Sequence, residues 1–180
     1  MNYEGGIWVF GYGSLMWNPG FKFESVHRAT LRGYIRSFCL WSVHYRGTEA
    51  APGLVLGLDR QKDALCEGVA YFVPAALAEK AHQYLREREL VSYAYLEKIE
   101  RLALKDGRTV PAICYVVDKT HAQYADNIAI TEKARVISTA RGSAGDNLEY
   151  LESTSAHLQA LGIVDQECER LMGLVSGLAR

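Results

Sequence analysis

The sequence lacks the features that mark membrane, secreted and nucleic-acid-binding proteins. No apolar stretch is close to the length of a membrane-spanning helix, which is about 18 residues. Residues 1–6 have neither the basic start nor the apolar core of a signal peptide. The formal net charge is −1, and no block of Lys and Arg stands out. We therefore expect a cytoplasmic protein that has no membrane association and no nucleic-acid partner.

The spacings that bind metals and nucleotides are missing as well. The four cysteines include no Cys-x-x-Cys pair, and the five histidines show no metal-ligand spacing. Gly11 and Gly13 are followed by Met16 where a dinucleotide fingerprint needs its third glycine, and there is no Walker loop. The spacings therefore indicate neither a metal site nor a nucleotide-binding loop, and we expect the cysteines to be reduced residues of the core.

What the sequence does have is ordinary globular composition. It is 180 residues long, 49% hydrophobic and 23% charged, which is enough chain for a proper core. No internal repeat, linker or low-complexity segment interrupts it. We expect a single domain over residues 1–180. Strand patterns dominate the first two-thirds and helical patterns follow, which predicts an α+β fold.

Local patterns place the expected elements. Apolar runs predict strands over residues 7–10, 27–45 (one or two), 54–58, 68–73, 93–104 and 109–117. Asp106-Gly107 predicts that the last two form a hairpin. Helices are predicted from Pro74 onward and over residues 131–140, 147–161 and 165–178. Asp165 is placed to cap the last of these.

The first predicted strand runs straight into Gly11-Tyr12-Gly13-Ser14. Glycines let the main chain turn sharply and approach a bound group, because no Cβ stands in the way. Successive N–H groups in such a turn can cradle an anion or a developing oxyanion. A tight turn without a ligand is the alternative. Ser14 is not in a nucleophile elbow, since Tyr12 and Met16 occupy the glycine positions.

The helix after Pro74 ends in the charged run Arg86–Glu89. At about 100° per residue, Arg88 falls within the apolar stripe and Glu89 at its edge, while Arg86 and Glu87 point away. A carboxylate at the margin of the core has a raised pKa and is a useful base near neutral pH. An ordinary ion pair is the alternative. Arg46, beside a turn, could hold a substrate carboxylate or simply line a loop.

Four blocks together resemble the ChaC-like gamma-glutamylcyclotransferases, which are specific for glutathione. The resemblance runs from about Trp8 to the last predicted helix. Its blocks are residues 9–17, 44–53, 84–89 and 142–151, in the family's order. One departure is Leu90-Val91-Ser92-Tyr93, where many eukaryotic members have Lys-Gly-Gly-Tyr. This chain therefore lacks the two glycines that would make the loop over the site mobile in those members.

The resemblance implies a small mixed β-barrel flanked by helices, with the site at the barrel mouth. It implies glutathione as the substrate, 5-oxoproline and cysteinylglycine as products, and neither metal nor cofactor. Glu89 corresponds to the catalytic glutamate. The implied substrate-binding residues are Val9, Phe10, Gly11, Tyr12, Gly13, Ser14, Leu15, Arg46 and Tyr150. No oligomeric state is implied.

Three alternatives remain open at this point. A cyclotransferase of the same fold could act on other γ-glutamyl amines or peptides. The chain could be a non-catalytic regulatory binding protein. It could also be a serine hydrolase that uses Ser14, although no histidine is placed by sequence to activate that hydroxyl.

Overall fold

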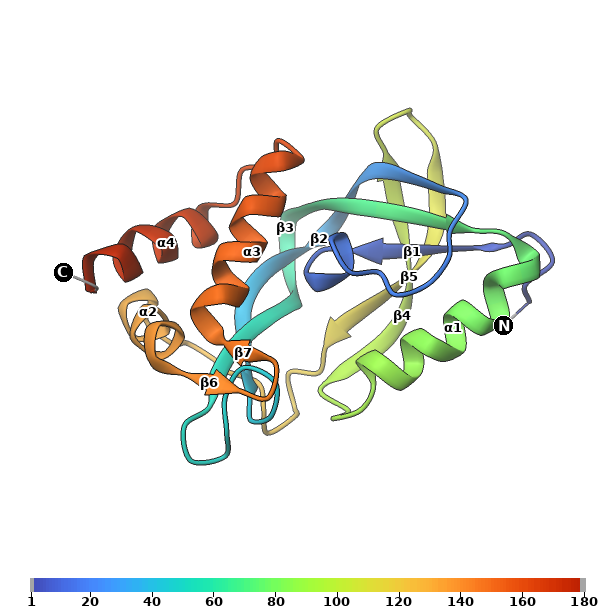
Figure 1. The fold of residues 1–180 in the computed structure, drawn as a ribbon. Helices are drawn as coiled ribbons and strands as arrows, with labels where there is room; N and C mark the ends of the chain where they lie inside the picture. Colours follow the sequence, from blue (N-terminus) through green and yellow to red (C-terminus); the bar gives the residue numbers. More distant parts are fainter. Residues whose placement is uncertain (1, 179–180) are drawn as a thin grey trace. The chain divides into compact units, whose positions relative to one another are not determined.

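The computed structural model describes residues 2–178, which group into two contact units (Figure 1). The first unit comprises Met1–Arg36 and Leu58–His121, and the second comprises Ser37–Gly57 and Ala122–Arg180. Five strands form a closed barrel in the order β1-β3-β2-β4-β5. Their bounds are β1 Ile7–Gly11, β2 Ser25–Ser42, β3 Gly53–Val73, β4 Tyr95–Leu104 and β5 Thr109–Val117. With four α-helices, this confirms the expected α+β class.

The barrel closes through long-range pairing of β1. This strand pairs antiparallel with β3, from Ile7 opposite Val73, and parallel with β5 through Val9 opposite Ile113. Strands β4 and β5 form the expected hairpin, with Gly107 in its turn at a φ of +93°. Glycine adopts that left-handed conformation without a Cβ clash.

Strand β3 differs from the expectation of two short strands at residues 54–58 and 68–73. It is continuous from Gly53 to Val73. Residues 60–63 are exposed, and most of their neighbours up to Glu67 are not buried either. An exposed strand needs no apolar alternation, because neither face contributes to the core. Strand β2 is likewise one strand, from Ser25 to Ser42.

Helix α1, in the first unit, spans Ala75–Glu89. Pro74 has the extended dihedral angles of an N-cap, so the helix begins one residue later than predicted. Its buried face consists of Ala78, Ala81, His82 and Leu85. The stripe is therefore rotated toward Glu89, four residues beyond Leu85, and Arg88 borders it. The prediction had these two side chains the other way round, because it placed the half-buried Leu77 and Tyr84 in the stripe and left out Ala78 and His82.

The second unit contains the C-terminal helices α2 (Ile130–Thr139), α3 (Asn147–Ala160) and α4 (Gln166–Leu178). All three confirm the predicted helices to within a residue or so. The main-chain N–H of Cys168 donates to Asp165 Oδ1 at 3.0 Å, which confirms the predicted cap. Between α2 and α3, the short strands β6 (Arg141–Gly142) and β7 (Gly145–Asp146) form a two-stranded sheet.

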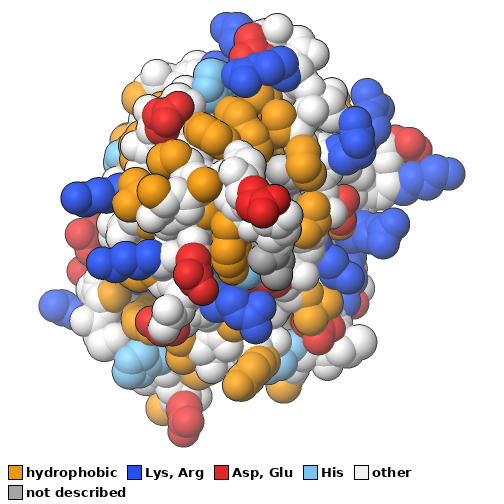
Figure 2. Space-filling view, turned by 90° about the vertical axis from the view of Figure 1, so that its right-hand side faces the viewer, with side chains coloured by type: hydrophobic (Ala, Val, Ile, Leu, Met, Phe, Trp, Pro, Cys, Tyr) orange, Lys and Arg blue, Asp and Glu red, His pale blue; other side chains and the backbone are white. Residues whose placement is uncertain are grey.

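Charge is distributed without segregation by sign on the face drawn in Figure 2, where acidic and basic side chains are interspersed among apolar ones. This matches the near balance of 20 basic and 21 acidic residues. Among the helices of residues 2–178, none has the length and hydropathy needed to cross a bilayer.

Candidate active site

The glycine turn follows β1 and leads into a 3₁₀ turn, η1 (Ser14–Met16). The N–H of Met16 donates to Gly13 O at 2.8 Å, and the N–H of Asn18 donates to Ser14 O at 2.8 Å. The N–H groups of Ser14 and Leu15 therefore precede the first hydrogen bond of η1. Such leading N–H groups are the ones that a helix leaves for an external acceptor.

Two buried side chains hold the main chain of this turn. The Tyr71 hydroxyl, from β3, lies 2.9 Å from Leu15 O and 3.1 Å from Met16 O. Burial raises the pKa of Tyr71 to about 12, so the hydroxyl remains a donor at neutral pH. Arg36, from β2, donates from Nε to Tyr12 O at 2.5 Å and from Nη2 to Glu67 O. The turn is thus supported from two strands of the barrel.

Sequence reasoning missed Arg36, although a signal for it exists. Tyr34, Arg36 and Phe38 alternate along β2 and are all buried. A charged residue at an inward-facing strand position is rare unless its charge is paired or hydrogen-bonded. An arginine in the apolar register of a predicted strand therefore indicates a buried hydrogen-bonding role.

The predicted residues around the turn have different surroundings. The side chains of Val9 and Phe10 are fully buried in the core. Because the exposure of each whole residue is 0%, their main chain does not reach the surface in this structure either. The Tyr12 hydroxyl donates to Tyr115 O at 3.0 Å, which fixes the ring to β5.

Glu89, the last residue of α1, carries a carboxylate that is only 16% exposed. Its Oε1 lies 3.0 Å from Arg88 Nε. Burial raises the pKa of Glu89, and the charge and hydrogen bond of Arg88 oppose that rise without cancelling it. The carboxylate is therefore more basic than an ordinary surface glutamate.

Arg88 links Glu89 to the glycine turn. Its Nη2 donates to Ser14 Oγ at 3.0 Å, while its Nη1 donates to Asn18 O at 2.6 Å. The carboxylate and the turn, which the sequence singled out separately, therefore meet at one guanidinium group. The same bond weighs against a serine hydrolase, since the hydroxyl of Ser14 faces a guanidinium that cannot accept a proton.

A polar network adjoins Glu89 on the barrel side. Glu97 Oε2, from β4, lies 2.9 Å from His82 Nε2 and accepts from the Tyr115 hydroxyl at 3.1 Å. Burial, then the charges of Glu97 and Glu89, raise the pKa of Tyr115. Sequence reasoning did not find this cluster, because its members come from α1, β4 and β5. His82 is a buried histidine whose Nε2 is hydrogen-bonded to Glu97.

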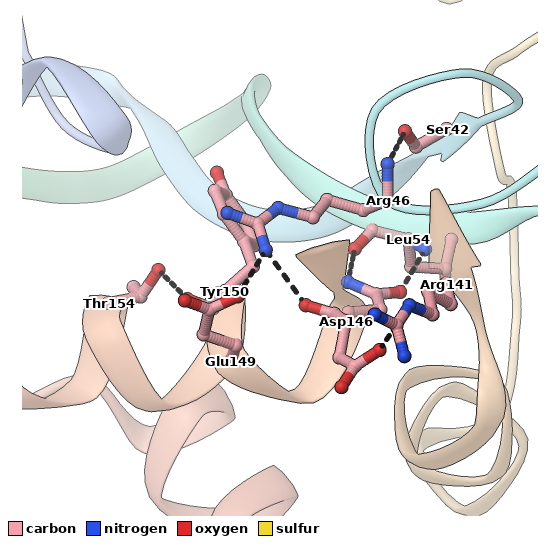
Figure 3. Close-up of polar contacts among 9 residues, drawn as sticks. Ser42, Arg46, Leu54, Arg141, Asp146, Glu149, Tyr150 and Thr154 are labelled. Atoms are coloured by element: carbon pink, nitrogen blue, oxygen red, sulfur yellow. Dashed lines mark hydrogen bonds and ion pairs between the residues drawn. The ribbon is translucent and has the colours of Figure 1, made fainter. Parts of the chain in front are cut away.

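In the second unit, Arg46 and Tyr150 lie together (Figure 3). Arg46 Nη1 pairs with Glu149 Oε2 at 3.0 Å and donates to Asp146 O at 2.9 Å, and its guanidinium lies 5.6 Å from the centroid of the Tyr150 ring. These contacts tie the loop of Arg46 to β7 and α3. The substrate-binding role of this pair stays a prediction.

Asn147, in the block of residues 142–151, has a structural role in the same unit. Its buried side chain accepts from the N–H of Leu54 at 2.6 Å and donates to Leu54 O at 2.7 Å. The amide thereby satisfies both main-chain groups of Leu54 at the start of β3.

The family model described as ChaC-like protein matches residues 7–178. The chain belongs to the ChaC-like family. A relative from Escherichia coli K12, named glutathione-specific gamma-glutamylcyclotransferase, is 38% identical over 175 residues, which cover 97% of this chain and 75% of that protein. A human relative, glutathione-specific gamma-glutamylcyclotransferase 1, is 33% identical over 96% of this chain and 78% of its own.

The fold comparison agrees with this ChaC-like assignment. A solved yeast gamma-glutamyl cyclotransferase specific to glutathione superimposes with a TM-score of 0.87 at 24% identity, covering 96% of each chain. This confirms the expected gamma-glutamylcyclotransferase-like fold. Among residues 2–178, no group of three or more His, Cys, Asp and Glu side chains is arranged to hold a metal ion.

Proposed function

We propose that this chain is a gamma-glutamylcyclotransferase that converts glutathione to 5-oxoproline and cysteinylglycine. One observation carries the proposal: a mostly buried carboxylate, Glu89, is held by the same guanidinium that bonds the glycine turn. The names of relatives at 38% and 33% identity support glutathione as the substrate.

The reaction depends mainly on how the enzyme positions the γ-glutamyl chain, because the attacking amine and the carbonyl belong to the same substrate. The free α-amine of the γ-glutamyl group attacks its own γ-carbonyl, and a five-membered ring closes as the new C–N bond forms. The amide bond to cysteine then breaks, and its nitrogen leaves with a proton as the amine of cysteinylglycine. No water is consumed. Because the attack is intramolecular, holding the ring-forming conformer removes much of the barrier.

Glu89 acts as the general base and then as the general acid. The amine starts largely as ammonium, with a pKa near 8 or above, and must lose a proton before it attacks. The raised pKa of Glu89 suits it to take that proton near neutral pH and to return it to the departing nitrogen. Proton transfer of this kind contributes about 10²- to 10⁴-fold to a rate.

The main chain from Gly11 to Leu15 holds the γ-glutamyl end, and Val9 and Phe10 support this turn from the core. Donors of this turn, including the N–H groups of Ser14 and Leu15, face the oxyanion of the tetrahedral intermediate. In other enzymes, removing one oxyanion-hole donor raises the activation free energy by about 3 kcal/mol. Substrate-binding roles for Arg46 and Tyr150, in the second unit, are a separate part of the proposal.

We also propose that the protein works in the cytoplasm as a single domain. Its four cysteines are buried thiols, which suits a reducing compartment.

The test is to incubate the purified protein separately with reduced glutathione, γ-glutamyl-alanine and γ-glutamyl-lysine, and to quantify 5-oxoproline. We expect release from glutathione. Release from the other two compounds alone would reject glutathione and assign the chain to other γ-glutamyl amines. No release from any of the three would favour a non-catalytic regulatory binding protein.

A further inference from the structure

We propose that Arg88 is a positioning residue, which fixes the Glu89 carboxylate relative to the glycine turn. The inference rests on the proposed function, because it assigns to Arg88 the task of aligning the base of that reaction. Arg88 itself need not touch the substrate, since it acts through Glu89.

The guanidinium divides its donors between the two parts of the site. Nε faces Glu89 Oε1 at 3.0 Å, while the terminal nitrogens reach Ser14 Oγ at 3.0 Å, Asn18 O at 2.6 Å and Pro19 O at 3.4 Å. A planar guanidinium presents its donors in a rigid fork, so fixing one edge on the turn fixes the direction of the other edge. Lysine, as a point charge on a flexible stem, cannot hold both directions.

The surrounding packing restrains the fork further. Arg88 Nη1 lies 3.3 Å from the hydroxyl of Tyr84, one helical turn earlier on α1. Gly20 has a φ of +75°, and a Cβ built there would lie 2.0 Å from that hydroxyl. The loop after η1 therefore packs directly against the last turns of α1. The Arg88 side chain is only 21% exposed.

The charge of Arg88 has a second effect on Glu89. The groups that face this carboxylate are Arg88 on α1 and Tyr115 on β5. The Tyr115 hydroxyl is bonded to Glu97 on β4, and Glu97 in turn pairs with Arg86 and His82. Arg88 lowers the pKa of Glu89 against the larger effect of burial. Without Arg88 that opposition disappears, and a larger fraction of Glu89 is protonated at neutral pH, where it cannot serve as a base.

The experiment compares Arg88→Gln and Arg88→Lys with the wild type. Arg86→Gln is the matched control, because it removes one charge from the same helix end, where Arg86 is 54% exposed and pairs with Glu97. We expect Arg88→Gln to lose about 100-fold in kcat at pH 7, the scale of a misplaced catalytic group, and to shift the acid limb of the pH profile upward. Arg88→Lys should keep the acid limb near its wild-type position but still lose kcat. Arg86→Gln should stay within about twofold.

A second readout needs no substrate. The Glu89 side-chain carboxyl is titrated by ¹³C NMR in the wild type and in both Arg88 variants, with folding checked by circular dichroism. A midpoint that moves up in Arg88→Gln supports the inference. It is overturned if that midpoint and the acid limb stay at their wild-type positions, or if Arg88→Lys keeps full kcat. A wild type without turnover would reject the proposed function instead, and the NMR midpoints would then show only whether Arg88 controls the ionisation of Glu89.

Discussion

At the scale of single residues, the account depends on the balance of forces at Glu89. Burial disfavours the ionised carboxylate, and Arg88 favours it. The sequence indicated this carboxylate because it follows an apolar helical stripe. The sequence could not indicate the bond from Arg88 to Ser14, because that contact joins residues 74 positions apart.

This balance predicts a stability difference that depends on pH. Burial raises the pKa of Glu89 in the folded state above its ordinary value, so between these two pKa values the folded state binds more protons than the unfolded state. The contribution of Glu89 to stability therefore decreases as pH rises through the folded-state pKa. We expect Glu89→Gln, which removes the charge, to raise Tm relative to the wild type more at pH 7 than at pH 4.5. Calorimetry at both pH values checks this; an equal difference at the two would contradict the raised pKa.

At the scale of elements, local signals predicted what local interactions determine. The β4–β5 hairpin, the three C-terminal helices and the Asp165 cap depend on neighbouring residues, and all are present. The continuity of β3 was missed because its exposed middle lacks apolar alternation. Closure of the barrel between Val9 and Ile113 is non-local, so only the resemblance to a known family implied it.

The 3₁₀ turn η1 gives a prediction at this scale. Tyr71→Phe removes the hydroxyl that bonds Leu15 O and Met16 O. We expect a loss of about 1 kcal/mol in the free energy of unfolding, because buried carbonyls lose a donor. The turn should also be less well fixed, so kcat with glutathione should fall while the barrel remains folded. Urea unfolding and steady-state kinetics measure the two effects; wild-type values in both would show that Tyr71 does not support the turn.

Asn147 gives a second prediction, in the other contact unit. Asn147→Ala removes both hydrogen bonds to Leu54 and leaves buried main-chain groups unsatisfied, which should cost about 2 kcal/mol or more in the free energy of unfolding. Asn147→Asp should cost more, because a buried carboxylate cannot donate to Leu54 O. Urea denaturation ranks the variants. An aspartate variant as stable as the wild type would contradict this role.

At the scale of the whole molecule, neither contact unit is a continuous stretch of chain. The chain passes between them three times, at Arg36–Ser37, Gly57–Leu58 and His121–Ala122, and the first two passages lie inside strands β2 and β3. A strand that contributes to both units links their unfolding. We therefore predict one cooperative transition, as expected of a single domain. Differential scanning calorimetry should give equal calorimetric and van't Hoff enthalpies; two resolved transitions would contradict it.

The central claim is that Glu89 moves the proton during ring closure. Its most direct test measures 5-oxoproline and cysteinylglycine released from reduced glutathione by the wild type, by Glu89→Gln and by Glu87→Gln, an exposed glutamate of the same helix. The account predicts equal amounts of the two products from the wild type and from Glu87→Gln. It predicts a loss of at least about 100-fold in kcat for Glu89→Gln, with glutathione still bound in calorimetric titration. Undiminished turnover by Glu89→Gln would contradict the account.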